Sequence, residues 1–198
     1  MNFKGARDYI IDRLHAKLKP PLYYHSVEHT LDVYEATCRL IEMESLEESQ
    51  HLLLKTAALY HDSGILIRYT DHETESVRLI HDLLPGFGYS TGDIDEIGRL
   101  IMRTKLPQRA VTPGEQILCD ADLDYLGRDD FFIHSFQLQL EWNQLGIRKT
   151  NLHEWFEIQI RFLSDHRYFT KSASGLREEK KQQHLTDIKT IFSSTQKF

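Results

Sequence analysis

The sequence predicts an all-α fold, and three observations support that prediction. Apolar residues recur every three or four positions in one segment after another, which is the spacing of one helix face. Proline-glycine pairs and capping residues separate these segments, as they do at helix ends. No series of segments shows the apolar-polar alternation of strands. We therefore expect a helical bundle, with all 198 residues in a single domain.

The first expected helix covers residues 3–18 and ends at a pair of prolines. The second covers residues 27–41, where the apolar positions alternate in steps of four and three. Ser26 is suited to cap this helix. His25 then lies just before the helix, and His29 lies in its first turn.

The third expected helix opens with a capping box at residues 45–48 and ends at His61 and Asp62. Its apolar residues face nearly all directions, which is typical of a buried central helix. Gly64 is suited to a left-handed C-terminal cap. A second capping box at residues 70–73 opens the next helix, which stops at a proline-glycine pair.

The second half of the chain is also helical in pattern. Its aromatic residues are expected in the core or in a contact between two copies of a homodimer, whereas Lys180 and Lys181 are expected on a solvated helix face. The stretch from Thr170 to Gly175 is the best linker candidate, although the helix after it has apolar residues to pack. The expected helices cover residues 93–104, a short segment that ends near Gly127, and residues 130–145, 152–165 and 176–192.

Composition and charge exclude several classes of protein. The formal net charge of −6 disfavours a broad nucleic-acid or anionic-membrane surface. The amino-terminal residues lack the apolar core of a signal peptide, and no apolar run approaches the length of a membrane span. Two cysteines, Cys38 and Cys119, are too few for a disulfide framework. We expect a cytoplasmic protein.

Three polar elements interrupt the apolar pattern. A Tyr-His-x-x-x-His element ends at His29, a His-Asp doublet follows the central helix, and an Ala-Asp-Leu element holds Asp122. An aspartate at the end of a nearly apolar helix is costly unless it is paired or bound to a metal. Adjacent residues converge more easily at a helix end than in its middle, where they project about 100° apart. His61 and Asp62 are therefore candidates to bind one ion.

The order and context of these elements resemble the HD superfamily of metal-dependent phosphohydrolases over residues 20–127. The resemblance implies a divalent ion (Mn²⁺, Fe²⁺, Zn²⁺ or Mg²⁺) held between the central helices by His29, His61, Asp62 and Asp122. Two imidazoles and two carboxylates suit such ions and leave positions for water and substrate. We expect one ion and allow for a second. The helices of residues 130–198 are expected to pack on this core.

The implied activity is hydrolysis of a small phosphate ester, such as a nucleotide, by a phosphomonoesterase or a phosphodiesterase. His25 resembles the proton donor of the phosphodiesterase branch, although a helix-capping role fits it equally well. Asp62, besides binding metal, or Asp122 is expected to contact the attacking water. His72, Arg103 and Lys105 are candidates to contact the substrate, while the basic pair would also complement a helix dipole.

Asp120 is a candidate to orient a histidine ligand, or it is simply solvated. Two departures limit the choice of substrate: Ile65 replaces the lysine that often follows His-Asp-x-Gly, and the Glu-Asp pair of the branch that acts on guanosine tetraphosphate is missing.

The same motifs suggest four other functions, of which we retain two and exclude two. An HD-fold di-iron oxygenase and a metal-binding sensor without turnover are the alternatives that we retain. His25-Ser26-Val27-Glu28-His29 also matches an inverted zinc-protease motif, but His25 is expected outside the helix that this motif needs. A calcium loop starting at Asp120 fails, because Tyr125 and Phe131 occupy its required glycine and glutamate positions.

Overall fold

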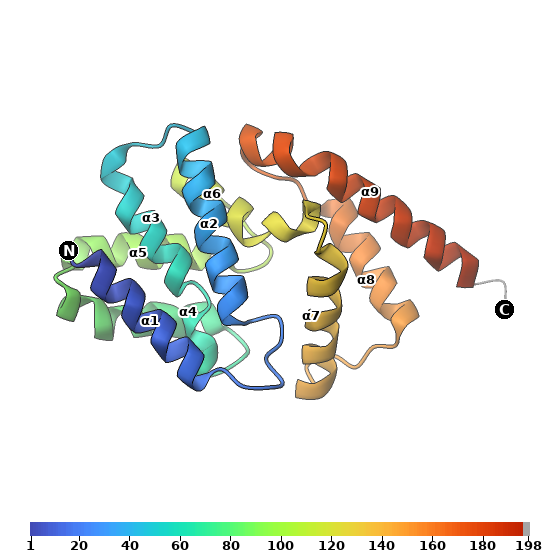
Figure 1. The fold of residues 1–198 in the computed structure, drawn as a ribbon, viewed down its shortest axis with the longest axis horizontal. Helices are drawn as coiled ribbons and strands as arrows, with labels where there is room; N and C mark the ends of the chain where they lie inside the picture. The colour runs from blue at the N-terminus through green and yellow to red at the C-terminus, as the bar shows by residue number, and fades with distance from the viewer. Residues whose placement is uncertain (196–198) are drawn as a thin grey trace.

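A computed structural model describes residues 1–195 and shows nine α-helices and three short 3-10 helices, with no β-strand in this range (Figure 1). The prediction of an all-α fold is confirmed. None of these helices combines the length and apolar character that a membrane span requires. The α-helices are α1 (Phe3–Lys17), α2 (Val27–Met43), α3 (Glu48–Tyr60), α4 (His72–Leu83), α5 (Thr91–Thr104), α6 (Pro113–Asp122), α7 (Phe131–Leu145), α8 (Leu152–Asp165) and α9 (Lys171–Thr195). The 3-10 helices are η1 (Ser63–Leu66), η2 (Leu84–Phe87) and η3 (Asp124–Gly127).

Two apolar cores divide the helices between them. Helices α1–α6 build the larger core, and α7–α9 with η3 build the second. In Figure 1, α7 lies between α1–α6 on one side and α8 on the other. Each core also contains side chains from the other half of the chain. Tyr24 packs in the second core, whereas Tyr168 and Ala173 pack in the first. This interlocking favours the single domain that the sequence predicts, and that domain organisation stays a prediction.

Side-chain caps begin several of the helices. Ser26 caps α2, as predicted, and its hydroxyl accepts a hydrogen bond from the backbone N–H of His29 at 3.2 Å. Reciprocal capping boxes open α5, α6 and α8, where a side chain at each N-cap pairs with an acidic residue three positions later. These boxes satisfy backbone N–H groups that would otherwise lack partners.

The two capping boxes predicted for α3 and α4 are wrong. Ser45 has a positive φ of 50° in the turn after α2, so Glu47 occupies the N-cap of α3 and makes no side-chain cap. At α4 the N-cap is Asp71, which is left-handed with a φ of 62° and also makes no cap. The Asp71 carboxylate pairs instead with Arg68 and Lys105.

Gly64 does not form the predicted left-handed cap, because it lies within η1. The structure requires glycine there for a different reason. A Cβ at this position would lie 2.1 Å from the His72 carbonyl oxygen and 2.3 Å from the Ser76 backbone nitrogen. The Gly64 N–H also donates to the Ser76 hydroxyl at 2.7 Å. The glycine therefore lets the turn after Asp62 lie directly against α4.

The linker predicted for Thr170–Gly175 is also wrong, because α9 already begins at Lys171. The buried carboxylate of Asp120 accepts hydrogen bonds from the backbone N–H groups of Phe169 and Thr170 at 2.8 Å, and from the Thr170 hydroxyl at 2.7 Å. Burial raises the pKa of Asp120 even though these bonds favour its charged form. Asp120 thus fixes the start of α9 and neither orients a histidine ligand nor lies in solvent.

Candidate metal centre

Three helix ends bring the predicted metal ligands together. His29 lies in the first turn of α2, His61 and Asp62 follow α3, and Asp122 is the last residue of α6. Single ligand atoms of His29, His61 and Asp122 lie within 4.8 Å of one another. The Asp62 Oδ2 atom lies 3.4 Å from Nε2 of His29 and 3.1 Å from Nε2 of His61. The Asp122 Oδ1 atom lies 3.5 Å from both nitrogens.

The donor atoms of this cluster fit a cation. Nε2 of His29 and Nε2 of His61 are buried and lack a hydrogen-bond partner among residues 1–195. Nδ1 of His61 lies 2.8 Å from the Ala58 carbonyl oxygen, which can only accept, so Nδ1 carries the proton of the neutral ring. Nε2 therefore directs a lone pair toward carboxylate oxygens, an arrangement that a cation between them would stabilise.

The charges around the cluster agree with this arrangement. Burial alone lowers the pKa of His61, but the Asp62 carboxylate and the contact with Asp122 outweigh burial and raise it well above its usual value. Burial would raise the pKa of Asp62, yet the neighbouring histidines, His61 foremost, hold it well below its usual value. The surroundings of these histidines thus favour positive charge, whether it is a proton or a metal ion.

His72 contacts the other oxygen of Asp62. Its Nε2 lies 3.1 Å from Asp62 Oδ1, and its Nδ1 lies 2.8 Å from the Tyr69 carbonyl oxygen. Burial opposes protonation of His72, but the Asp62 charge dominates and raises its pKa to about 9. His25, Asp62 and His72 form a second group with ligand spacing. Asp62 therefore stands between two histidine groups, one at each of its oxygens.

Glu141 is the main residue of the site that sequence reasoning missed. From α7, its Oε1 atom lies 2.5 Å from Nδ1 of His25 and accepts a bond from the Tyr69 hydroxyl at 2.8 Å. Its Oε2 atom accepts from the backbone N–H groups of Tyr24 and His25 at 3.0 and 3.2 Å. The Glu141 side chain is fully buried.

Burial would raise the pKa of Glu141, but its bond to His25, followed by that to Tyr69, lowers it. The carboxylate therefore stays charged and holds the His25 ring in place. The one available signal in the sequence was a lone glutamate between Leu140 and Trp142, within an aromatic-rich helix.

Gln108 also contacts a predicted ligand, and sequence reasoning missed it as well. The loop after α5 carries this residue, and its side-chain N–H donates to Asp122 Oδ2 at 2.9 Å. The other carboxylate oxygen, Oδ1, is the one that approaches the two histidines. Gln108 is thus placed to fix the orientation of Asp122, and no local motif marks it.

The two predicted basic residues each have a carboxylate partner. Arg103 lies 3.1 Å from the buried Glu115, and Lys105 pairs with Asp71, the residue before His72. Their contact with a substrate stays a prediction. Glu28, the base that a zinc-protease reading would need, is exposed to solvent, and His25 lies before α2. The geometry gives that protease reading no support.

A helical bundle with this order of elements is an HD-domain fold, and comparison with solved structures supports that assignment. The chain is similar to Bacillus subtilis YpgQ in complex with ADP, with a TM-score of 0.68 and 20% identity over 98% of this chain and 97% of that one. It is also similar to a predicted HD superfamily hydrolase from an uncultured Thermotogales bacterium, with a TM-score of 0.64 and 17% identity over 94% and 91% of the two chains.

No family model and no curated protein matches the sequence. At these identities the solved structures establish the fold alone. The HD resemblance that the sequence carries is confirmed at the level of that fold.

Proposed function

We propose that this protein is a metal-dependent phosphohydrolase that acts on a nucleotide or another small phosphate ester. His29, His61, Asp62 and Asp122 converge around two buried imidazole nitrogens that have no hydrogen-bond partner in the described part of the chain, and this convergence carries the proposal. These four residues would hold a divalent ion such as Mn²⁺, Fe²⁺, Zn²⁺ or Mg²⁺. When bound, such an ion supplies a water of lowered pKa and polarises a phosphoryl oxygen.

His25 is the proposed proton donor. Glu141 occupies its Nδ1, which leaves Nε2 as the nitrogen that faces a substrate. In the proposed reaction a water molecule that has lost one proton to solvent forms a new bond from its oxygen to phosphorus. The bond between phosphorus and the leaving oxygen breaks, and the His25 proton passes to that oxygen. Histidine suits such a transfer near neutral pH.

Asp62 has a second proposed role, which is to accept a hydrogen bond from the attacking water. Its contact with His72 fixes the orientation of the carboxylate. Arg103 and Lys105 are proposed contacts of the substrate phosphate, because both carry N–H donors that suit phosphate oxygens. His72 is the third proposed contact, and it would have to turn its Nε2 N–H from Asp62 to the phosphate. The ADP bound to the structurally similar YpgQ supports a nucleotide as the substrate class.

The test is product formation from a panel of nucleoside monophosphates, cyclic nucleotides and other phosphate esters. Chelator-stripped protein with Mn²⁺ restored would be compared with Asp122→Ala and with Asp95→Ala, an exposed aspartate on α5. The wild type and Asp95→Ala should turn over the same substrate. Asp122→Ala should lose at least about a thousandfold in rate, because the ion that activates water is lost.

Full activity in a correctly folded Asp122→Ala variant would contradict the proposal. Absence of product across the panel, with metal bound, would favour a sensor. Bound iron with oxygen consumption would favour the oxygenase.

A further inference from the structure

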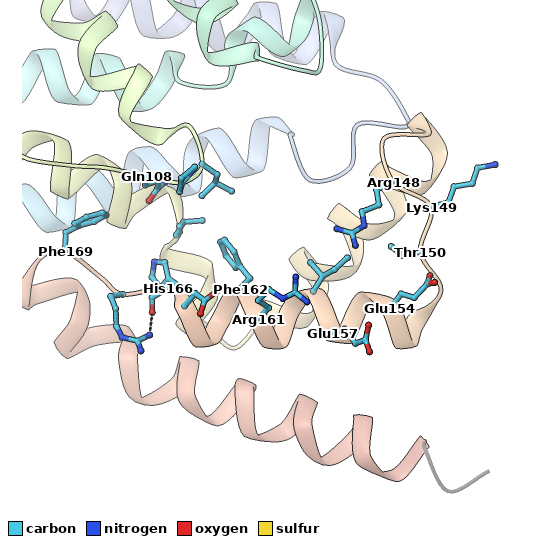
Figure 2. A pocket seen from close by; sticks show the side chains of 16 residues that line it. Gln108, Arg148, Lys149, Thr150, Glu154, Glu157, Arg161, Phe162, His166 and Phe169 are labelled. Carbon is cyan, nitrogen blue, oxygen red and sulfur yellow. Dashed lines mark hydrogen bonds between the residues drawn. The ribbon is translucent and has the colours of Figure 1, made fainter.

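A cavity of about 1020 Å³ lies between the loop after α5 and helix α8 (Figure 2). Gln108 lines this cavity and also donates to Asp122, so one side chain connects the cavity to the candidate metal centre. Figure 2 shows Phe162 and His166 at the carboxyl end of α8, below the loop that carries Gln108. The volume is that of a small-molecule site and far exceeds the volume of a phosphate group.

Lys181 fixes the proton position on His166. Its ammonium group lies 2.8 Å from the His166 carbonyl oxygen, 3.2 Å from His166 Nδ1 and 2.9 Å from Glu178 Oε2. An ammonium group has three N–H donors and no acceptor. Nδ1 must therefore accept, and the single ring proton lies on Nε2. The Lys181 side chain is fully buried, so the predicted solvated helix face is wrong for this residue.

The Nε2 N–H group of His166 has no hydrogen-bond partner in the part of the chain that the structure describes, and solvent does not reach it. The neighbouring rings of Phe162 and Tyr168 pack around the imidazole, with centroids 6.2 and 4.6 Å away. A buried donor without an acceptor is costly, and such groups are rare unless a ligand or water satisfies them. Burial, reinforced by the Lys181 charge, lowers the pKa of His166 to about 4, so the ring stays neutral at physiological pH.

The rest of the lining suits a flat and neutral group. Phe162 and Phe169 provide aromatic surface, and aromatic faces favour stacking with planar rings. The positive and negative side chains that line the cavity nearly balance in number, which disfavours binding of another anionic group besides the substrate phosphate. They are Arg148, Lys149, Arg161 and Arg167 against Glu154, Glu157 and Asp165.

We propose that this cavity binds the heteroaromatic base of a nucleotide substrate, and that a shift of the cavity wall on binding lets His166 Nε2 donate a hydrogen bond to an acceptor atom on that base. The inference rests on the proposed phosphohydrolase function and defines the group that is esterified to the phosphate. In this arrangement the candidate metal centre receives the phosphate, while the cavity beside Gln108 receives the base.

The kinetic test compares hydrolysis of AMP and CMP with hydrolysis of glycerol phosphate, which has no ring. His166→Leu should raise KM for the two nucleotides about tenfold, the usual effect of one lost hydrogen bond, and should change kcat/KM for glycerol phosphate by less than about twofold. His166→Gln retains a side-chain N–H donor and should recover most of the nucleotide affinity. His81→Leu, an exposed histidine on α4, is the matched control.

A second variant covers the case in which His166→Leu fails to fold. Phe169 is 37% exposed, so Phe169→Ala removes part of the cavity wall without opening the core, and it should raise KM for the nucleotides selectively. Equal losses for all three esters, or no loss for any of them in folded variants, would overturn the inference.

A binding readout separates this inference from the proposed function. In metal-free protein with ¹⁵N-labelled histidine, NMR should show the proton of His166 on Nε2, and AMP or CMP should shift that signal. A shift without turnover of any ester would refute the phosphohydrolase and uphold the nucleotide cavity. A proton on Nδ1, or an Nε2 signal that neither nucleotide shifts, would overturn the inference.

Discussion

The candidate metal centre and the cavity beside α8 both contain buried histidine nitrogens without a partner among the residues that the structure describes, but their charged surroundings are opposite. In the metal centre, Nε2 of His29 and Nε2 of His61 face two carboxylates. At the cavity, the ammonium group of Lys181 occupies the other nitrogen of His166. The pKa of His61 is raised, whereas that of His166 falls to about 4.

The comparison shows that an unpartnered histidine nitrogen does not define a ligand by itself. The group at the other ring nitrogen decides whether the unpartnered nitrogen of a neutral histidine directs a lone pair or an N–H outward. The Ala58 carbonyl oxygen places the proton of His61 on Nδ1, whereas the Lys181 ammonium group places that of His166 on Nε2. Carboxylates around His61 favour a cation. A lysine beside His166 leaves an N–H that requires an acceptor.

The largest expected effect tests whether the candidate metal centre binds a cation. Mn²⁺ at about a thousand times its Kd should stabilise chelator-stripped protein by about 4 kcal/mol, because the ion binds the native state. His61→Ala should remove most of that gain, whereas His81→Ala should retain it. Urea unfolding with and without Mn²⁺ measures the difference. Equal stabilisation of all three proteins would place the ion elsewhere.

The second test uses pH at the cavity. The native state keeps His166 neutral down to about pH 4, whereas the unfolded chain protonates it near its ordinary value of 6.5. Between these values the unfolded state binds more protons, so this histidine makes stability fall as the pH falls. The gap corresponds to about 3 kcal/mol.

Replacement of His166 by glutamine should remove this contribution and flatten the pH dependence of unfolding between pH 6.5 and 4. The measurement is the difference between the wild-type and His166→Gln unfolding free energies, which cancels the other titrating groups. The same pH slope in both proteins would show that burial and the Lys181 charge do not suppress protonation of the ring.

Glu141 provides the third test. It gives Nδ1 of His25 a hydrogen-bond partner, whereas the histidines of the other two regions each keep one nitrogen without a partner among the described residues. Glu141→Gln should lower kcat about thirtyfold for esters with a poor leaving group, since His25 would lose the carboxylate that positions it. The loss should be small for p-nitrophenyl phosphate, whose leaving oxygen needs no proton. Glu28→Gln changes an exposed glutamate nearby and should have no effect. Equal losses for both leaving groups would indicate a structural role instead.

The smallest expected effect concerns Gln108, the side chain that joins the two regions. Gln108→Leu should weaken Mn²⁺ binding about tenfold, because Asp122 would lose the donor that orients it. Gln116→Leu, at a half-buried glutamine on α6 that does not contact Asp122, is the control. Competition with a fluorescent chelator measures both affinities. Unchanged Mn²⁺ affinity in Gln108→Leu would show that Gln108 does not couple the cavity to the metal centre.

Much of the fold could be predicted because helical periodicity is a local property. Local reasoning failed where contacts between distant segments decide the backbone. Gly64 is required by its approach to α4, and Thr170 joins the start of α9 because Asp120, fifty residues earlier, satisfies its N–H. Ser45 has a positive φ and lies in the turn before α3, so it does not occupy the expected N-cap position.

The candidate site divides in the same way. His29, His61, Asp62 and Asp122 belong to elements with a recognisable order, and the structure brings them together, while their binding of metal stays a prediction. Glu141 had no such context, because its partner lies 116 residues away and the interaction depends on how α7 packs. A lone glutamate in an aromatic-rich helix was the only signal of it in the sequence.

The distance along the chain between His25 and Glu141 has a consequence for the coupling of the two cores. The four proposed metal ligands come from α2, α6 and the turn after α3, whereas the carboxylate that holds His25 comes from α7, which packs in the second core. A displacement of α7 from the first group of helices would therefore release His25 while the proposed ligands stay together.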